Sequence, residues 1–278
     1  MKSLVLIFFL PILALAQDDQ FTPASTNSLD HYVALYSATD LKVNATSSEE
    51  LYSFVEKLNS KREGFKHDKA FLEYIFTKTH QRFLKNYTEY SSFNDLLNKG
   101  AYNCLTGTAL YALLLEHFSI PYKIIETNYH IFLMATTSDG EVLLETTDPA
   151  HGFTDNEAEI EKRISGYKQN TIQQSTRKKQ YYHFSFDLYN TVNLDEMLGL
   201  LYYNHAIKAY NNHQWVNAVA YLEKASLLYQ SPRLEEFSRI ILLSVVESKL
   251  DTSLKETYIK KIQYVRKRKM EVVADASY

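Results

Sequence analysis

Apolar residues recur with the period of a helix along the first third of the chain. In residues 47–58 they lie three or four positions apart and so fall on one helix face: Leu51, Phe54, Val55 and Leu58. Ser47 and Glu50 form a capping-box pattern ahead of this face, which predicts that the helix begins there. The same period predicts a second helix over residues 67–84 and a short one over 92–98.

The hydrophobic period then changes from that of a helix to that of strands. A helix is predicted from Cys104 to just before Pro121. Three segments rich in β-branched and aromatic residues then predict strands: Tyr122–Thr127, His130–Thr136 and Glu141–Thr147. Residues 138–140 read Ser-Asp-Gly, a turn that folds the last two strands into an antiparallel hairpin. A further strand is predicted over 181–186, so the fold class is α+β.

From about residue 193 to 269 the pattern is helical again. The segment from Ala209 to Ala225 resembles the centre of a tetratricopeptide repeat, with aromatic and small residues at the expected places: Trp215, Ala218, Tyr221 and Ala225. One repeat is clear, whereas three or more usually form an independent solenoid. We therefore expect these helices to pack on the preceding domain. They would serve either as a docking surface for a peptide or protein partner or as a structural appendage.

The N-terminal residues have the pattern of an export signal. A short basic start precedes an apolar run from Leu4 to Ala16, and residues 14–16 read Ala-Leu-Ala, a small-x-small cleavage pattern. The alternative is a membrane anchor. The run is, however, shorter than the ~20 residues of a spanning helix, and Pro11 interrupts it. We expect a secreted or periplasmic protein with no stable membrane span after signal removal.

These patterns divide the chain into five parts. The expected parts are a signal peptide at 1–16, a flexible lead at 17–30, an α+β domain at 31–188, a helical region at 189–270 and a tail at 271–278. Hydrophobic residues make up 45% of the chain, as in ordinary globular proteins, and the net charge of −3 gives no general attraction to nucleic acid.

The chain has one cysteine, Cys104, which cannot form a disulfide within the chain. It is a buried bystander, an intermolecular link or a reactive thiol. Its expected place at a helix N-terminus favours the third, because unpaired N–H groups and the positive end of the helix dipole stabilise a thiolate. The same N–H groups are suited to hold a developing oxyanion.

A histidine and an aspartate complete a candidate catalytic triad. His130 opens the second strand and Asp148 follows the third, so the hairpin brings both to its open end, as a base and its orienting carboxylate require. The predicted catalytic residues are Cys104, His130 and Asp148. Asn103 and Tyr129 are neighbours that would supply oxyanion or substrate hydrogen bonds, with ordinary packing as the alternative. Three such groups without a close-spaced pair do not favour a metal site, and no cofactor is expected.

The stretch from Tyr102 to Pro121, YNCLTGTALYALLLEHFSIP, resembles the nucleophile helix of the transglutaminase-like superfamily. The order Cys, His, Asp also matches that family, and the resemblance covers about residues 90–153. It implies a papain/transglutaminase-like core of N-terminal helices and a nucleophile helix packed on a small antiparallel sheet, followed by the repeat-like helices. Two departures are a Tyr-Asn pair where the family commonly has a small residue before the cysteine, and Leu-Thr where a Trp often follows it.

The resemblance implies an exported cysteine enzyme that acts on amide bonds of a peptide or protein. Peptidase or amidase-type hydrolysis through an acyl-enzyme is the favoured function. Acyl transfer to an amine, as in protein cross-linking, is an alternative with the same triad. The third alternative is a catalytically silent scaffold that binds proteins through its repeat-like helices, which the two departures around the cysteine favour.

Overall fold

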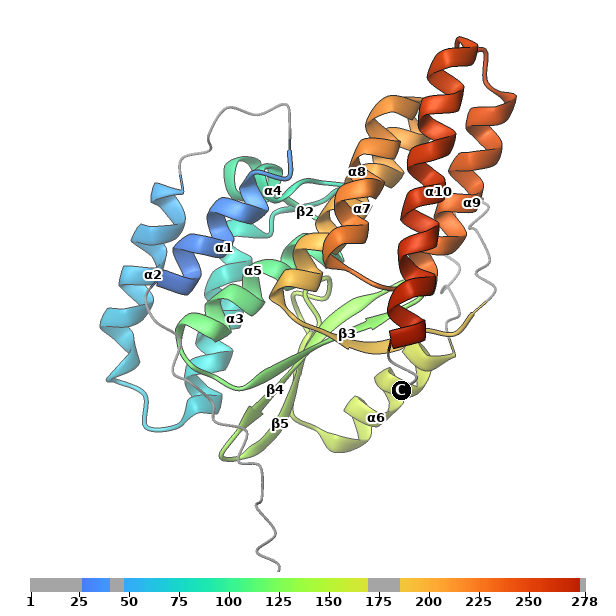
Figure 1. The fold of residues 1–278 in the computed structure, drawn as a ribbon. Coiled ribbons are helices and arrows are strands. Elements are labelled where there is room, and N and C mark those ends of the chain that lie inside the picture. The colour runs from blue at the N-terminus through green and yellow to red at the C-terminus, as the bar shows by residue number, and fades with distance from the viewer. Residues whose placement is uncertain (1–26, 41–47, 170–185, 276–278) are drawn as a thin grey trace, which may run out of the picture.

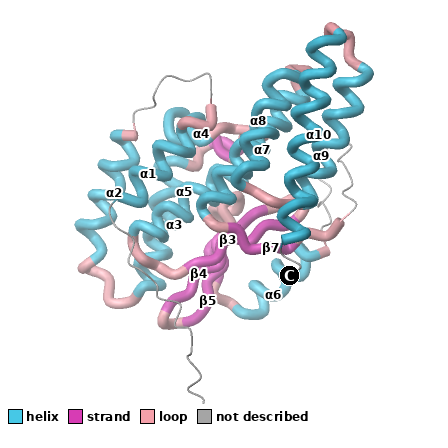
Figure 2. Tube along the Cα trace, in the orientation of Figure 1, coloured by secondary structure: helices cyan, strands magenta, loops and turns pink. Residues whose placement is uncertain are grey.

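The structure, a computed structural model, describes residues 27–40, 48–169 and 186–275. They form an α+β fold of N-terminal helices, a five-stranded antiparallel sheet and C-terminal helical hairpins (Figures 1 and 2), which confirms the predicted class. The helices before the sheet are α1 (Asn27–Ser37), α2 (Glu49–Arg62), α3 (Asp68–Phe83), α4 (Phe93–Lys99) and α5 (Cys104–His117).

The sheet has the strand order β6-β5-β4-β3-β7, and all neighbouring strands are antiparallel. Its strands are β3 (Tyr122–Thr127), β4 (Ile131–Thr137), β5 (Gly140–Leu144), β6 (Phe153–Thr154) and β7 (Tyr189–Val192). Thr137 pairs with Gly140 and Leu133 with Leu144, so the predicted hairpin is confirmed. A separate parallel pair joins β1 (Asn86–Tyr87) to β2 (Ala101–Tyr102), just ahead of α5.

Helices cover both faces of the sheet (Figure 1). Side chains alternate between the two faces along a strand, so Ile131 and Leu133 of β4 join the main core beneath α5. Phe132 of the same strand packs with Ile160 of α6 (Glu157–Lys168) in a second, smaller core. Burial on both faces explains why β4 reads as a continuous apolar run.

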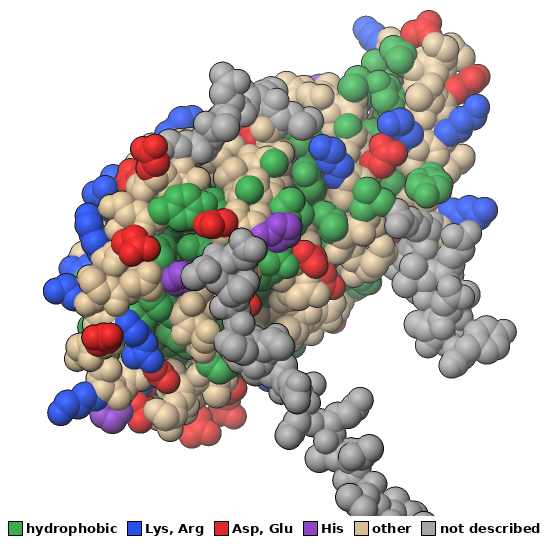
Figure 3. All heavy atoms as spheres, turned by 60° about the vertical axis from the view of Figure 1, so that its left-hand side comes forward, with side chains coloured by type: hydrophobic (Ala, Val, Ile, Leu, Met, Phe, Trp, Pro, Cys, Tyr) green, Lys and Arg blue, Asp and Glu red, His purple; other side chains and the backbone are tan. Residues whose placement is uncertain are grey.

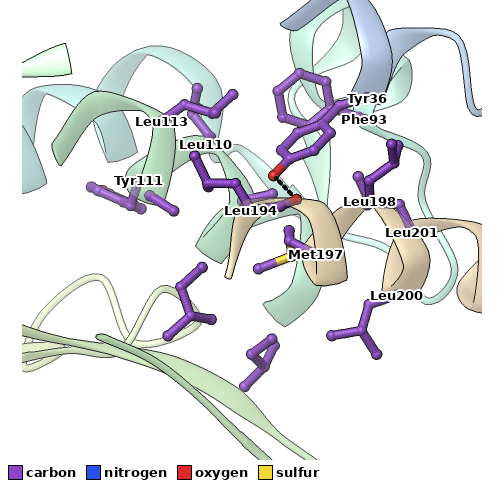
Figure 4. Packing of buried hydrophobic residues seen from close by; sticks show 14 of the residues in the cluster. Tyr36, Phe93, Leu110, Tyr111, Leu113, Leu194, Met197, Leu198, Leu200 and Leu201 are labelled. Atoms are coloured by element: carbon purple, nitrogen blue, oxygen red, sulfur yellow. Dashed lines mark hydrogen bonds between the residues drawn. The ribbon is translucent and has the colours of Figure 1, made fainter. Parts of the chain in front are cut away.

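The C-terminal helices share the main core. They are α7 (Leu194–Asn211), α8 (Trp215–Leu228), α9 (Pro232–Glu247) and α10 (Thr252–Asp275). Figure 4 shows Met197 and Leu198 of α7 among side chains of the N-terminal part, where the Tyr36 hydroxyl donates to the carbonyl oxygen of Leu194 at 2.8 Å. These helices therefore pack on the preceding part of the chain, as expected. In Figure 3, hydrophobic atoms also gather on the surface of this projecting helical part.

Several boundaries differ from the sequence predictions. Ser47 lies outside the described residues, and α2 begins at Glu49 after Ser48, whose side chain makes no capping hydrogen bond. Helix α1 begins within the expected lead, since Leu29 and other apolar residues of its inner face are buried. The sequence did not predict α6. This helix covers the second face of the sheet, where Ile160 packs in the smaller core.

Other predictions fall on residues that the structure does not describe. The signal peptide at 1–16 lies outside the described residues, and so does the strand predicted at 181–186 except for its last residue. The edge strand that pairs with β3 is β7, within the segment assigned to the helical region. Among the helices of the described ranges, none has both the length and the apolar character needed to cross a membrane.

Candidate active site

Cys104 is the first residue of α5 and is half-buried. Asn103 caps this helix, because its Oδ1 accepts from the Thr106 N–H at 2.9 Å while the Thr106 hydroxyl accepts from the Asn103 N–H at 3.0 Å. The Asn103 side chain therefore fixes the start of α5, and the residue also borders the pocket beside Cys104. The first N–H groups of a helix have no acceptor within it, so this end of α5 offers donors beside the sulfur.

The end of α5 is held close to the loop that follows β5. The Thr146 hydroxyl donates to the carbonyl oxygen of Cys104 at 3.5 Å. Gly107, one turn along the helix, allows this approach, because a Cβ there would lie only 2.8 Å from the Thr146 oxygen. Helix α5 and the loop after β5 therefore pack closely against each other.

His130 lies beside the thiol, in the tight connection between β3 and β4. Its N–H donates to the Thr127 hydroxyl at 3.1 Å, and its carbonyl oxygen accepts from the Thr127 N–H at 2.8 Å. The imidazole contacts the Glu145 carboxylate through Nε2, and the Cys104 thiol lies near enough to the ring to raise the pKa of His130. Since Nε2 faces Glu145, Nδ1 is the ring nitrogen left for the thiol. Stacking on Phe132, at 6.2 Å between ring centroids, supports this orientation.

Four groups hold the Glu145 carboxylate, whose side chain is only 5% exposed. One oxygen contacts the His130 imidazole and accepts from the Tyr167 hydroxyl at 2.9 Å. The other oxygen accepts from the N–H of Thr147 at 2.9 Å and from its hydroxyl at 2.6 Å. The carboxylate is therefore buried, fully hydrogen-bonded and fixed against the imidazole.

Burial and charge act in opposite directions on this pair. Burial lowers the pKa of His130, but the charge of Glu145, its hydrogen bond to the ring and the nearby Cys104 outweigh it and raise the pKa above its ordinary value. Burial raises the pKa of Glu145, but the His130 charge and the hydrogen bonds from His130 and Thr147 hold it below its ordinary value. The pair is an imidazolium–carboxylate pair at neutral pH, and an imidazolium beside a thiol favours the thiolate.

Asp148, the carboxylate that the sequence placed in the triad, has other partners. It accepts from the His151 N–H at 3.0 Å and from the Arg163 guanidinium at 3.3 Å. The structure thus places Cys104 and His130 at one site, as the sequence predicts. The carboxylate that contacts the imidazole is Glu145, however, and not Asp148.

The strand register explains why Glu145, and not Asp148, lies beside His130. Leu133 faces Leu144, so the next pair outward is Phe132 and Glu145. Residues two apart share a face, which puts His130 and Glu145 on the same face as diagonal neighbours. Asp148 lies three residues beyond Glu145, in a turn that the Gly152 N–H closes by donating to its carbonyl oxygen at 2.7 Å. Counting the register from the hairpin turn would have found Glu145 in the sequence.

Cys104 and His130 line a pocket of about 700 Å³. Asn128 and Tyr129, from the connection between β3 and β4, form part of its wall, so both predicted neighbours of the site, Asn103 and Tyr129, border this space. Another part of the wall comes from α7 and α9, which the sequence analysis did not connect with the site. The site is therefore shared between the sheet, α5 and the C-terminal helices.

The fold and this site define a class: an α+β protein with a cysteine at a helix N-terminus, paired with a histidine that a buried glutamate orients. Comparisons with protein-family models, with curated proteins and with solved structures found no match. The resemblance to the transglutaminase-like superfamily stays a prediction from the sequence. Within the described ranges, no group of three His, Cys, Asp or Glu side chains is placed to hold a metal ion.

Proposed function

We propose that this chain is an exported cysteine enzyme that acts on amide bonds, with Cys104 as nucleophile, His130 as proton carrier and Glu145 as its orienting carboxylate. The observation that carries the proposal is one imidazole, held by a buried carboxylate, that shares a pocket with the thiol at the N-terminus of α5. Capping of α5 by Asn103 supports it, because it fixes backbone donors beside the sulfur.

The helix packed on an antiparallel sheet agrees with a papain/transglutaminase-like core, and we include that finer fold in the proposal. We also propose that α7 and α8 form a hairpin of the tetratricopeptide kind. Trp215 begins α8, and Ala218 and Ala225 are fully buried in the core it shares with its neighbours. Small buried residues at this spacing are what close helix crossing requires.

The proposed reaction proceeds in two steps. The Cys104 thiolate attacks an amide carbonyl, a C–S bond forms, and the His130 imidazolium gives its proton to the leaving amine as the C–N bond breaks. The neutral imidazole then takes a proton from water, whose oxygen bonds to the acyl carbon as the C–S bond breaks. Glu145 stays ionised and holds the ring in place in both steps. An amine in place of water would give acyl transfer.

The test is alkylation of Cys104 by iodoacetamide, followed over a range of pH. We expect rapid reaction at about pH 6, well below the ~8.5 at which a free thiol ionises. His130→Ala and Glu145→Gln should each slow the reaction at this pH by about tenfold or more, because an orienting or charged partner of a thiolate is worth at least ~1.4 kcal/mol.

Asp148→Asn is the matched control, since it removes a carboxylate three residues from Glu145 that has other partners. Its alkylation profile should stay close to that of the unaltered protein. Equal damage from Asp148→Asn and Glu145→Gln would contradict the assignment of Glu145. An ordinary thiol profile in the unaltered protein, with Cys104 accessible, would instead favour the binding-scaffold function. Product analysis of cleaved peptides with and without added amine then separates hydrolysis from transfer.

A further inference from the structure

Much of the wall of the pocket around the thiol is apolar. Half-buried hydrophobic side chains from three helices border the space: Leu105 of α5, Ile207 and Tyr210 of α7, and Ile240 of α9. These side chains also pack against the main core, so they are held in position. An apolar surface that stays partly open next to a reactive thiol is suited to an apolar group of a bound molecule.

The charged groups inside the pocket neutralise each other. The Arg233 guanidinium of α9 lies 3.1 Å from the Glu126 carboxylate of β3, and both side chains are largely buried. The Tyr229 hydroxyl also donates to Glu126 at 2.6 Å. Glu89, the other carboxylate that borders the pocket, is exposed to solvent at its edge. A charged group that entered this space would lose its hydration, and the buried charges there are already paired with each other.

Arg233 also joins the two walls. Its guanidinium donates to the carbonyl oxygens of Thr127 at 2.6 Å and of Asn128 at 3.1 Å. These residues belong to the connection that carries His130, so α9 is anchored directly beside the imidazole. These contacts fix the position of α9 relative to the thiol, and with it the position of its apolar side chains.

We propose that α7 and α9 give the enzyme its specificity: the pocket takes a bulky, uncharged apolar or aromatic side chain of the substrate peptide, next to the carbonyl that Cys104 attacks. This inference rests on the proposed function and names its substrate class. The volume of about 700 Å³ lies within the ~300–1,000 Å³ of ligand pockets, so it accepts such a side chain with its neighbouring main chain.

The test uses maleimides that differ only in the group on nitrogen. The Cys104 sulfur bonds to one alkene carbon and a proton adds to the other, so no further reactant is needed. Rates for N-methyl-, N-cyclohexyl- and N-(carboxypropyl)maleimide are each divided by the rate with N-acetylcysteine. We expect the cyclohexyl reagent to gain about tenfold or more over the methyl reagent, because burying a ring-sized apolar group is worth at least that factor. The carboxylate reagent should show no gain.

Two variants locate the preference on the C-terminal helices. Ile240→Asn and, independently, Ile207→Asn should each cut the normalised cyclohexyl preference several-fold. Leu243→Asn is the matched control on α9, because Leu243 is 63% exposed and does not border the pocket. Thermal unfolding of each variant checks that it is folded, and having the second variant on another helix keeps the test decisive if one fails to fold.

The outcomes separate this inference from the proposed function. Equal normalised rates for all three reagents, a preference for the carboxylate reagent, or a cyclohexyl preference that survives both Asn variants would each overturn the inference. A clear cyclohexyl preference combined with an ordinary iodoacetamide pH profile would support the apolar pocket and refute the enzyme.

Discussion

Replacing Arg233 with methionine tests how the C-terminal helices are attached to the sheet. The substitution keeps most of the length and volume of the side chain but removes the guanidinium. Glu126, which is 2% exposed, would keep the hydrogen bond from Tyr229 and lose its opposite charge. The carbonyl oxygens of Thr127 and Asn128 would lose a charged donor as well.

The expected cost follows from that uncompensated charge. Removing one partner of a buried ion pair destabilises a protein by about 3–5 kcal/mol. Since 1 kcal/mol corresponds to roughly 2–4 °C for a chain of this size, the midpoint of thermal unfolding should fall by roughly 6–20 °C. The double variant Glu126→Gln/Arg233→Met buries no unpaired charge, so it should be more stable than Arg233→Met alone by about 2 kcal/mol.

The pH dependence gives an independent check of the same reasoning. Burial raises the pKa of Glu126, and the Arg233 charge opposes that shift, so removing Arg233 raises the pKa further. A carboxyl group whose pKa is raised on folding contributes its stability fully below the unfolded pKa of ~4.3 and loses it as the pH rises through the folded pKa. The loss caused by Arg233→Met should therefore be smaller at about pH 5 than at about pH 8.

Urea unfolding of the unaltered protein and both variants, followed by circular dichroism at the two pH values, measures these differences. A loss below about 1 kcal/mol for Arg233→Met would refute the account, because that is the value of an exposed ion pair. A double variant as unstable as the single one would also refute it.

Other predictions concern a loop, a helix and a buried histidine. Gly152→Ala should destabilise the protein by about 1–3 kcal/mol and slow Cys104 alkylation, because a Cβ would lie 2.1 Å from the Glu145 carbonyl oxygen. Gly166→Ala, in open space on α6, should instead stabilise by about 1 kcal/mol; chemical denaturation distinguishes the two. Burial lowers the pKa of His205 to about 4, so its neutral form contributes stability above the unfolded pKa of ~6.5 that is lost as the pH falls. The free energy of unfolding should fall by about 2 kcal/mol from pH 7 to pH 5 in the unaltered protein but not in His205→Gln. An equal fall in both proteins would contradict this.

Local sequence patterns were sufficient to predict much of the fold. The strand β3 begins and ends where the sequence predicts, and α5 begins at Cys104 because Asn103 and Thr106 form a reciprocal cap. The turn ending at Gly140 sets the hairpin, since this residue adopts a positive φ of 119°. These features depend on a few neighbouring residues, and so they can be read without knowing the rest of the chain.

The sequence by itself therefore determined the fold class and indicated that Cys104 and His130 belong to one site. Only the tertiary structure decided that Glu145 faces the imidazole, that Tyr167 of α6 holds its carboxylate, and that α7 and α9 close the pocket. A shift of one residue in strand register moves a side chain to the opposite face, and a carboxylate three positions away looks equivalent in a linear pattern. Contacts between distant helices leave no periodic signal, because they depend on how the whole core packs.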